Sequence, residues 1–207
     1  MTAAPVPAAS DMAAAELAAL VSARICHDLV SPLGAIGNGL ELLHLCGTPT
    51  GPELSLMSQS VAAATARMRL FRVAFGADQP GARMARAEVT AILSGLAPGA
   101  RALVVWPAED LPRNEVRLGF LLLMCLETTL PYGGGITFRR EGTTWAIKAE
   151  AGRMAIDYVL WAVARGRAAP DAIGPRHVHF ALMPGALAAV GRKLSLHPGD
   201  GVLEVRA

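Results

Sequence analysis

The chain is organised around residues 25–33, which carry the sequence ICHDLVSPL. On a helix of 3.6 residues per turn, this segment and its continuation present one narrow apolar stripe. His27 points to the opposite side of that helix, beside the acidic residue Asp28. The stripe consists of Ile25, Leu29, Leu33, Ile36, Leu40 and Leu43. The segment therefore predicts an amphipathic helix that displays a histidine and an acid on its polar face.

Two interpretations of His27 are open from this pattern. A single exposed histidine on a helix is usually an ordinary solvated side chain, because a motif without context is weak evidence. Pro32 favours a use for the histidine, since a proline inside a helix costs about 3 kcal/mol and is easier to explain if a kink nearby serves a function. Three polar residues share the face of His27, and Gly34 near that face would let another surface approach the imidazole; the three are Arg24, Ser31 and Asn38.

Composition excludes several classes of function. The chain has 207 residues, enough for one large domain or two small ones, and a net charge of +2. No block of lysine and arginine stands out, so nucleic-acid binding is not indicated. The three cysteines, Cys26, Cys46 and Cys125, are far apart and show no CxxC spacing. We therefore expect reduced thiols, with neither a disulfide framework nor a bound metal.

Hydropathy predicts a cytoplasmic protein. Residues 1–10 are rich in alanine and proline, lack the pattern of a secretory signal and are expected to form a flexible tail. The most apolar run, residues 118–126, is ended by Glu127 well short of the ~20 residues that a membrane span needs. We interpret this run as a buried core helix.

Residues 11–76 predict a helical hairpin. A helix capped by Ser10 or Asp11 should run to about Cys46, with a bend at Pro32. Residues 47–51 have the composition of a turn, and a second helix should extend from about Glu53 to Phe75. Its apolar residues alternate at spacings of three and four, the heptad seam of a coiled coil; they are Leu54, Met57, Val61, Ala64, Met68, Phe71 and Phe75.

One hairpin cannot bury both of its apolar stripes. Two copies can do so as a four-helix bundle, and we therefore expect a homodimer with the histidines on its outer faces. The alternative is that the hairpin packs only on the second domain of its own chain.

The remainder of the chain predicts an α+β two-layer sandwich over residues 87–207, after a linker at 77–86. Helices are expected at 88–96, 114–130 with Asn114 as N-cap, and 184–190. Residues 158–165 are compatible with a helix or a strand. Strands are expected at 101–106, 135–140, 143–150, 193–197 and 202–206, with a hairpin turn at Glu141-Gly142.

The segment from His27 to Leu33 resembles the phosphoacceptor box of sensor histidine kinases: His, an acid, Leu, any residue, Ser or Thr, Pro, Leu. The longer run from Arg24 to Leu43 is closer to the ChpT-type histidine phosphotransferases of alphaproteobacteria, and the order of elements after it resembles the ATP-binding domain of histidine kinases. The resemblance implies that His27 accepts a phosphoryl group from an aspartyl phosphate on one receiver domain and passes it to an aspartate on another.

The same resemblance implies roles for neighbouring residues and for partners. Asp28 would hold the other ring nitrogen, and Arg24, Ser31, Gly34 and Asn38 would dock or position the receiver domain. A hybrid histidine kinase would be the donor and a DNA-binding response regulator the acceptor. Magnesium is expected to come with the receiver domain, because this chain shows no carboxylate cluster to hold it.

Three departures from the kinase pattern predict that the ATP site is lost. Residues 121–129 contain no asparagine where the kinases have their magnesium-binding box. Residues 150–155 read EAGRMA in place of Asp-x-Gly-x-Gly, and Gly133–Gly135 leads into a strand, whereas a phosphate loop leads into a helix N-terminus. We expect no nucleotide cofactor. A divergent ATP-dependent kinase and a dimeric scaffold that binds receiver domains without chemistry remain alternatives.

Two further histidines, His177 and His179, would lie on one side of a strand if that segment were extended. No Cys, Asp or Glu supplies an obvious third ligand at a suitable spacing. We therefore do not expect a metal site there.

Overall fold

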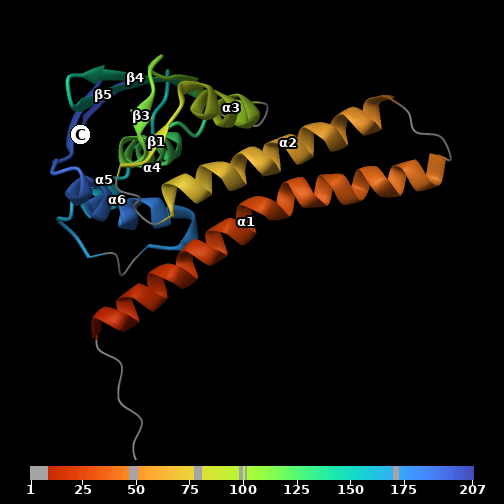
Figure 1. Ribbon diagram of the computed structural model, residues 1–207, viewed down its shortest axis with the longest axis horizontal. Helices are drawn as coiled ribbons and strands as arrows, with labels where there is room; N and C mark the ends of the chain where they lie inside the picture. Colours follow the sequence, from red (N-terminus) through yellow and green to blue (C-terminus); the bar gives the residue numbers. More distant parts are fainter. Residues whose placement is uncertain (1–8, 47–50, 77–80, 98–99, 101, 170–172) are drawn as a thin grey trace, which may run out of the picture.

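The computed structural model describes residues 9–46, 51–76, 81–97, 100, 102–169 and 173–207. Two long helices, α1 (Ala9–Cys46) and α2 (Gly51–Ala74), lie side by side as a hairpin, and the other elements gather at one end of it (Figure 1). Both helices match the predicted ranges to within two residues. Residues 47–50 of the predicted turn at 47–51 and residues 1–8 of the predicted tail at 1–10 lie outside the described residues. The rest is helical: α1 already includes Ala9, Ser10 and Asp11, so neither Ser10 nor Asp11 caps it, and α2 begins at Gly51.

Helix α1 continues through Pro32 without a break. Figure 1 shows that the helix changes direction part-way along its length, as expected for a helix with an internal proline. The half nearer the N-terminus passes the loop and helix formed by residues 173–189, so this half contacts the rest of the molecule as well as α2.

The C-terminal part contains a five-stranded sheet in the order β2-β4-β5-β7-β6. Only β2 and β4 are parallel; the other neighbours are antiparallel. The strands are β2 (Ala102–Val105), β4 (Gly134–Glu141), β5 (Thr144–Glu150), β6 (Ser195–Gly199) and β7 (Val202–Arg206). Helices α4 (Arg113–Thr129), α5 (Tyr158–Ala164) and α6 (Val178–Ala189) form the second layer (Figure 1). The predicted α+β two-layer sandwich is confirmed.

Side-chain alternation explains how the two layers pack. Along β5, Trp145, Ile147 and Ala149 are buried, while the residues between them face solvent. Helix α4 is apolar on almost every side and lies buried across its central turns, as the run at 118–126 predicted. Gly142 has a φ of +61°, which suits the tight turn predicted between β4 and β5.

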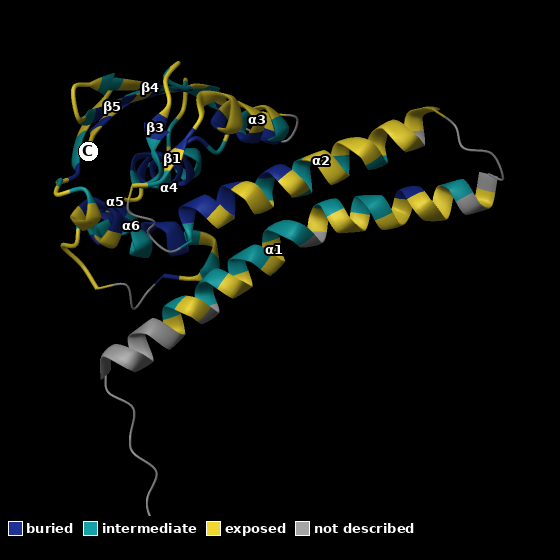
Figure 2. Ribbon diagram, viewed as in Figure 1, coloured by how far each residue is buried: buried dark blue, intermediate teal, exposed yellow. Residues whose placement is uncertain are grey.

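Helix α2 joins the hairpin to this core. Its last turns bury Leu70, Phe71 and Val73 in the same apolar cluster as the sheet and α4. Its first turns carry Leu54 and Leu56, which are 46% and 49% exposed. Figure 2 shows this gradient along α2, from buried near the C-terminal part to exposed at the far end.

Three local predictions are corrected or decided by the structure. Asn114 is not the N-cap, because α4 begins directly after Pro112 and the Asn114 carboxamide accepts a hydrogen bond from the Glu115 amide. Residues 158–164 form a helix, whose N-cap Asp157 accepts from two backbone amides. A short strand, β1 (Arg83–Met84), lies inside the predicted linker and pairs with β3 (Leu111–Pro112); helix α3 (Arg86–Leu96) follows it.

The segment around His177 is helical, not a strand. Pro175 begins a 3-10 turn, Pro175–His177, which leads directly into α6. Proline suits a first helical turn because its φ is already helical and it needs no amide partner. Val178, Met183 and Leu187 then recur on the buried side of α6. The two imidazoles therefore do not line one side of a strand.

Candidate functional site

His27 lies on α1 with its side chain half exposed. Its Nδ1 atom is 2.9 Å from Oδ1 of Asp28, whose side chain is only 12% exposed. The contact between the ring and the acid that was expected from the resemblance is therefore present within a single helical turn.

Arg24, one turn earlier on α1, fixes the other side of the carboxylate. Its Nε donates to Oδ2 of Asp28 at 2.9 Å. This spacing of four residues places both side chains on the same face of the helix. Each oxygen of Asp28 therefore has its own partner, and the carboxylate cannot rotate away from His27 without losing one of them.

Arg176 approaches the imidazole from the opposite side. Its Nη2 atom is 3.0 Å from Nε2 of His27, although the two residues are 149 positions apart. The guanidinium of Arg24 also donates through Nη1 to the backbone carbonyl of Arg176. His27, Asp28, Arg24 and Arg176 thus form a closed ring of hydrogen bonds between α1 and the 3-10 turn before α6.

The chemistry of the two neighbours fixes the tautomer of His27. An ionised carboxylate only accepts hydrogen bonds, and a guanidinium only donates them. Nδ1 must therefore carry the proton that faces Asp28, and Nε2 must present its lone pair to Arg176. A neutral imidazole with a lone pair on Nε2 and a half-exposed side chain can act as a nucleophile.

The other predicted docking residues lie on the same helix but outside this ring. Ser31, Gly34 and Asn38 are exposed on the following turns of α1. A Cβ atom added at Gly34 would meet nothing within 4 Å, so this position leaves open space beside the helix. The structure connects Arg24 to His27 through Asp28. Ser31, Gly34 and Asn38 instead form an exposed surface on α1 next to this ring of hydrogen bonds.

Sequence reasoning missed Arg176. It stands between Pro175 and His177, outside every predicted element, and no spacing rule connects it to His27. Only the packing of the C-terminal part against α1 brings the two together.

The rings of His177 and His179 lie 6.4 Å apart, measured between their centroids. His179 is fully buried against Phe180, and burial lowers its pKa well below the usual value, with the charge of Arg24 and His177 adding to the effect. Within the described ranges, no three His, Cys, Asp or Glu side chains come together in a way that could hold a metal ion.

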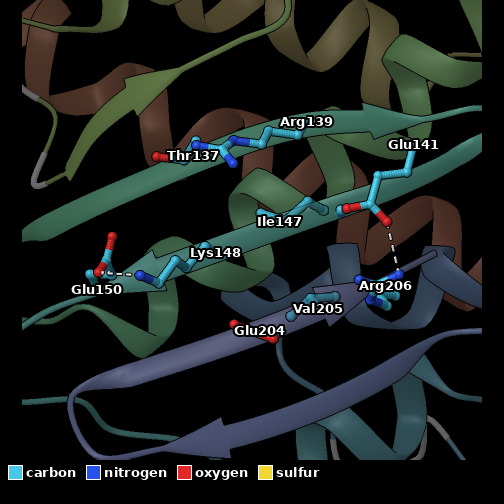
Figure 3. A pocket seen from close by; sticks show the side chains of 10 residues that line it. Thr137, Arg139, Glu141, Ile147, Lys148, Glu150, Glu204, Val205 and Arg206 are labelled. Carbon is cyan, nitrogen blue, oxygen red and sulfur yellow. Dashed lines mark hydrogen bonds and ion pairs between the residues drawn. The ribbon is translucent and has the colours of Figure 1, made fainter.

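A shallow cavity lies on the solvent-facing side of the sheet (Figure 3). Its charged residues are largely paired with each other: Lys148 with Glu150 at 2.7 Å and Arg206 with Glu141 at 2.9 Å. The cavity is lined by β4, β5 and β7 on the face away from α4 and α6. It is therefore separate from the ring around His27.

Comparison with known protein families identifies the family of this chain. A family model described as the histidine phosphotransferase C-terminal domain matches residues 86–201, more than half of the chain. The chain belongs to the histidine phosphotransferase family. The match covers α3 to β6 and includes Arg176, whereas His27, Asp28 and Arg24 lie before it.

The chain is also similar to individual proteins, one of which it matches over nearly its whole length. Protein phosphotransferase ChpT of Brucella abortus (strain 2308) is 33% identical over 135 residues, and the matched segment spans 64% of the length of each chain. The solved structure of a bacterial phosphotransferase is 26% identical, with a TM-score of 0.76 and coverage of 98% of both chains. A histidine kinase domain from the Erythrobacter litoralis EL346 blue-light activated histidine kinase is 15% identical, with a TM-score of 0.42 over 93% of this chain and 91% of the other.

Proposed function

We propose that this histidine phosphotransferase relays a phosphoryl group between receiver-domain aspartates through a phosphohistidine at His27. The observation that carries the proposal is the hydrogen bonding of His27, whose side chain is half exposed: Asp28 holds the proton on Nδ1, which leaves the lone pair on Nε2, toward the exposed Arg176. The membership in the family and the likeness of the phosphoacceptor box support the same chemistry.

The transfer step balances without a further reactant. Nε2 of His27 attacks the phosphorus of an aspartyl phosphate, the P–O bond breaks, and its electron pair leaves with the carboxylate of the partner. The proton stays on Nδ1, so the ring becomes positively charged when the N–P bond forms, and Asp28 offsets that charge. The second receiver aspartate reverses this step.

The partners follow from the resemblance and from the exposed face of α1. The receiver domain of a hybrid histidine kinase would donate, and that of a DNA-binding response regulator would accept. Arg24, Ser31, Gly34 and Asn38 offer polar groups and open space along the face next to His27. Magnesium would arrive with the receiver domain to offset phosphate charge.

The protein is proposed to act as a cytoplasmic homodimer. Residues Glu16–Leu43 of α1 are long and apolar enough to cross a membrane by length and composition. A single helix of this kind is weak evidence for a membrane span. Ionised Arg24 and Asp28 inside a span would each cost roughly 2.5–3.5 kcal/mol, and both belong to the ring that reaches Arg176. Exposed apolar side chains on the hairpin support a second copy as its partner.

The test is phosphoryl transfer from a labelled receiver domain, with labelled ATP alone in a parallel reaction. Wild type should acquire acid-labile label from the receiver only, and His27→Ala should acquire none. Asp28→Asn should transfer roughly 10- to 100-fold more slowly, because it removes a charge-assisted hydrogen bond of about 1.5–3 kcal/mol. Label from ATP would support a kinase, and absence of label from either source would leave a scaffold.

A further inference from the structure

Arg176 occupies the atom at which the chemistry would take place. Its guanidinium donates to Nε2 of His27 at 3.0 Å, and Nε2 is the nitrogen whose lone pair must form the bond to phosphorus. The same lone pair cannot serve both partners. Arg176 must therefore leave the nitrogen when a phosphoryl group arrives.

The side chain and the backbone of Arg176 differ in freedom. The residue is exposed, so its guanidinium can change rotamer without disturbing the core. Its backbone is anchored, because Pro175 fixes the preceding φ and the Arg176 carbonyl accepts from Arg24. A guanidinium on this anchor stays within reach of His27 after it leaves the nitrogen.

A phosphoryl group offers this guanidinium a better partner than a ring nitrogen. It carries close to two negative charges and three acceptor oxygens, which suit the planar fork of an arginine. Arg24 is less free to pair with phosphoryl oxygens, since its Nε donates to Asp28 and its Nη1 donates to the Arg176 carbonyl.

We propose that Arg176 is a phosphohistidine-site residue supplied by the C-terminal domain: it caps Nε2 in the resting protein and pairs with the phosphoryl oxygens after transfer. This proposal rests on the relay function proposed above. It assigns the C-terminal domain a direct part in stabilising phospho-His27, so that the complete site requires residues from both parts of the chain.

The experiment compares Arg176→Met, which keeps length but removes every donor, with Arg176→Lys, which keeps the charge. Arg139→Met is the matched control, because Arg139 is an exposed arginine on the far side of the sheet. Each full-length protein is equilibrated with a phosphorylated receiver domain, and the phosphohistidine fraction is measured. Each is also phosphorylated with the small donor phosphoramidate, which needs no docking surface, and the ³¹P spectrum and lifetime of phospho-His27 are recorded.

Arg176→Met should shift the transfer equilibrium away from phospho-His27 by about tenfold, the factor that corresponds to ~1.4 kcal/mol. Its ³¹P signal should move and its phosphohistidine should hydrolyse faster, with Arg176→Lys intermediate and Arg139→Met unchanged. A wild-type equilibrium and lifetime in Arg176→Met would overturn the proposal for Arg176 alone. Failure of wild type to accept phosphate from any receiver domain would instead overturn the relay function.

Discussion

At the scale of single residues, the proton on His27 is placed by two neighbours with opposite hydrogen-bonding capacities. Asp28 comes from the same helix, whereas Arg176 comes from the turn before α6. The nucleophilic state of the imidazole therefore depends on how α1 and the C-terminal domain contact each other. A change at this contact would alter the hydrogen bonding of His27 without any substitution at residues 27–33.

His179 predicts a pH dependence of stability. Burial, with the nearby charge of Arg24 and with His177, lowers its pKa well below the value of 6.5 that applies in the unfolded chain. Below pH 6.5 the unfolded state binds a proton that the folded state does not, so the free energy of unfolding should fall as the pH decreases from 6.5 toward the folded pKa. One such proton contributes a slope of at most about 1.4 kcal/mol per pH unit.

The measurement is the free energy of urea unfolding at pH 7.5, 6.5, 5.5 and 5.0. His179→Leu should show a shallower decrease than wild type below pH 6.5, because it has no proton to gain on unfolding. His197→Gln is the matched control, since His197 is exposed on β6. Parallel curves for wild type and His179→Leu would show that His179 is not the source of the loss of stability below pH 6.5.

Local sequence predicts part of this site and not the rest. The ring–acid pair at His27 and Asp28 needs only adjacent residues on one helix, and Arg24 is one turn away. Arg176 depends on long-range packing, for which a single sequence carries no periodic signal. Arg176, the member of the ring that comes from another element, is therefore the one that sequence reasoning could not find.

At the scale of elements, a buried charge cluster holds α4 to the sheet. Glu115 on α4 is 6% exposed and accepts from Arg140 of β4 at 2.7 Å and from Arg192, which follows α6, at 2.9 Å. One carboxylate thus connects a helix, a strand and the loop into β6. Its loss would leave two arginines with little exposure and no acidic partner at this point.

Glu115→Gln should therefore destabilise the protein by about 3 kcal/mol or more, because it breaks a buried pair and leaves its partners charged. Glu141→Gln is the matched control: Glu141 pairs with Arg206, but both side chains are about half exposed, so the loss should stay below about 1 kcal/mol. Chemical denaturation of both variants measures the difference. Equal losses of unfolding free energy in the two variants would show that the Glu115 cluster stabilises the protein no more than a surface ion pair does.

The elements that sequence predicted well are those with a strong internal period. Alternation specified β4 and β5, and the helical period specified α1 and α2 to within two residues. Strands of two residues, β1 and β3, are too short to carry a period. Helix α6 begins at Val178, before the predicted range of 184–190, because Pro175 starts a helical turn that leads directly into it.

At the scale of the whole molecule, the hairpin presents an apolar face that one chain does not cover. Leu54, Val61 and Met68 belong to the predicted heptad seam of α2 and are 46%, 50% and 56% exposed. On α1, Leu33 and Leu40 are 59% and 49% exposed. The alternative in which the hairpin packs only on its own second domain leaves these side chains in water, since in the described residues the hairpin reaches the core through the last turns of α2 and through α1 around Ile25.

A second copy would cover this face with the same seam. In a two-fold symmetric interface each substitution is present twice, so Val61→Glu would place two charges in the apolar contact. We expect its dimer dissociation constant to rise by at least about 100-fold, which corresponds to ~2.8 kcal/mol. Light scattering across a concentration series measures this change, and Gln59→Glu, exposed on the side of α2 opposite Val61, is the control.

The same variant separates assembly from chemistry. The ring of His27, Asp28, Arg24 and Arg176 is complete within one chain, so it does not need residues of a second copy. A monomeric Val61→Glu protein whose helix content is retained by circular dichroism should still form phospho-His27 from phosphoramidate. A wild-type protein that is monomeric at every concentration would contradict the dimer, whereas a monomeric variant with intact helices but no phosphorylation would show that the reactive site requires the second chain.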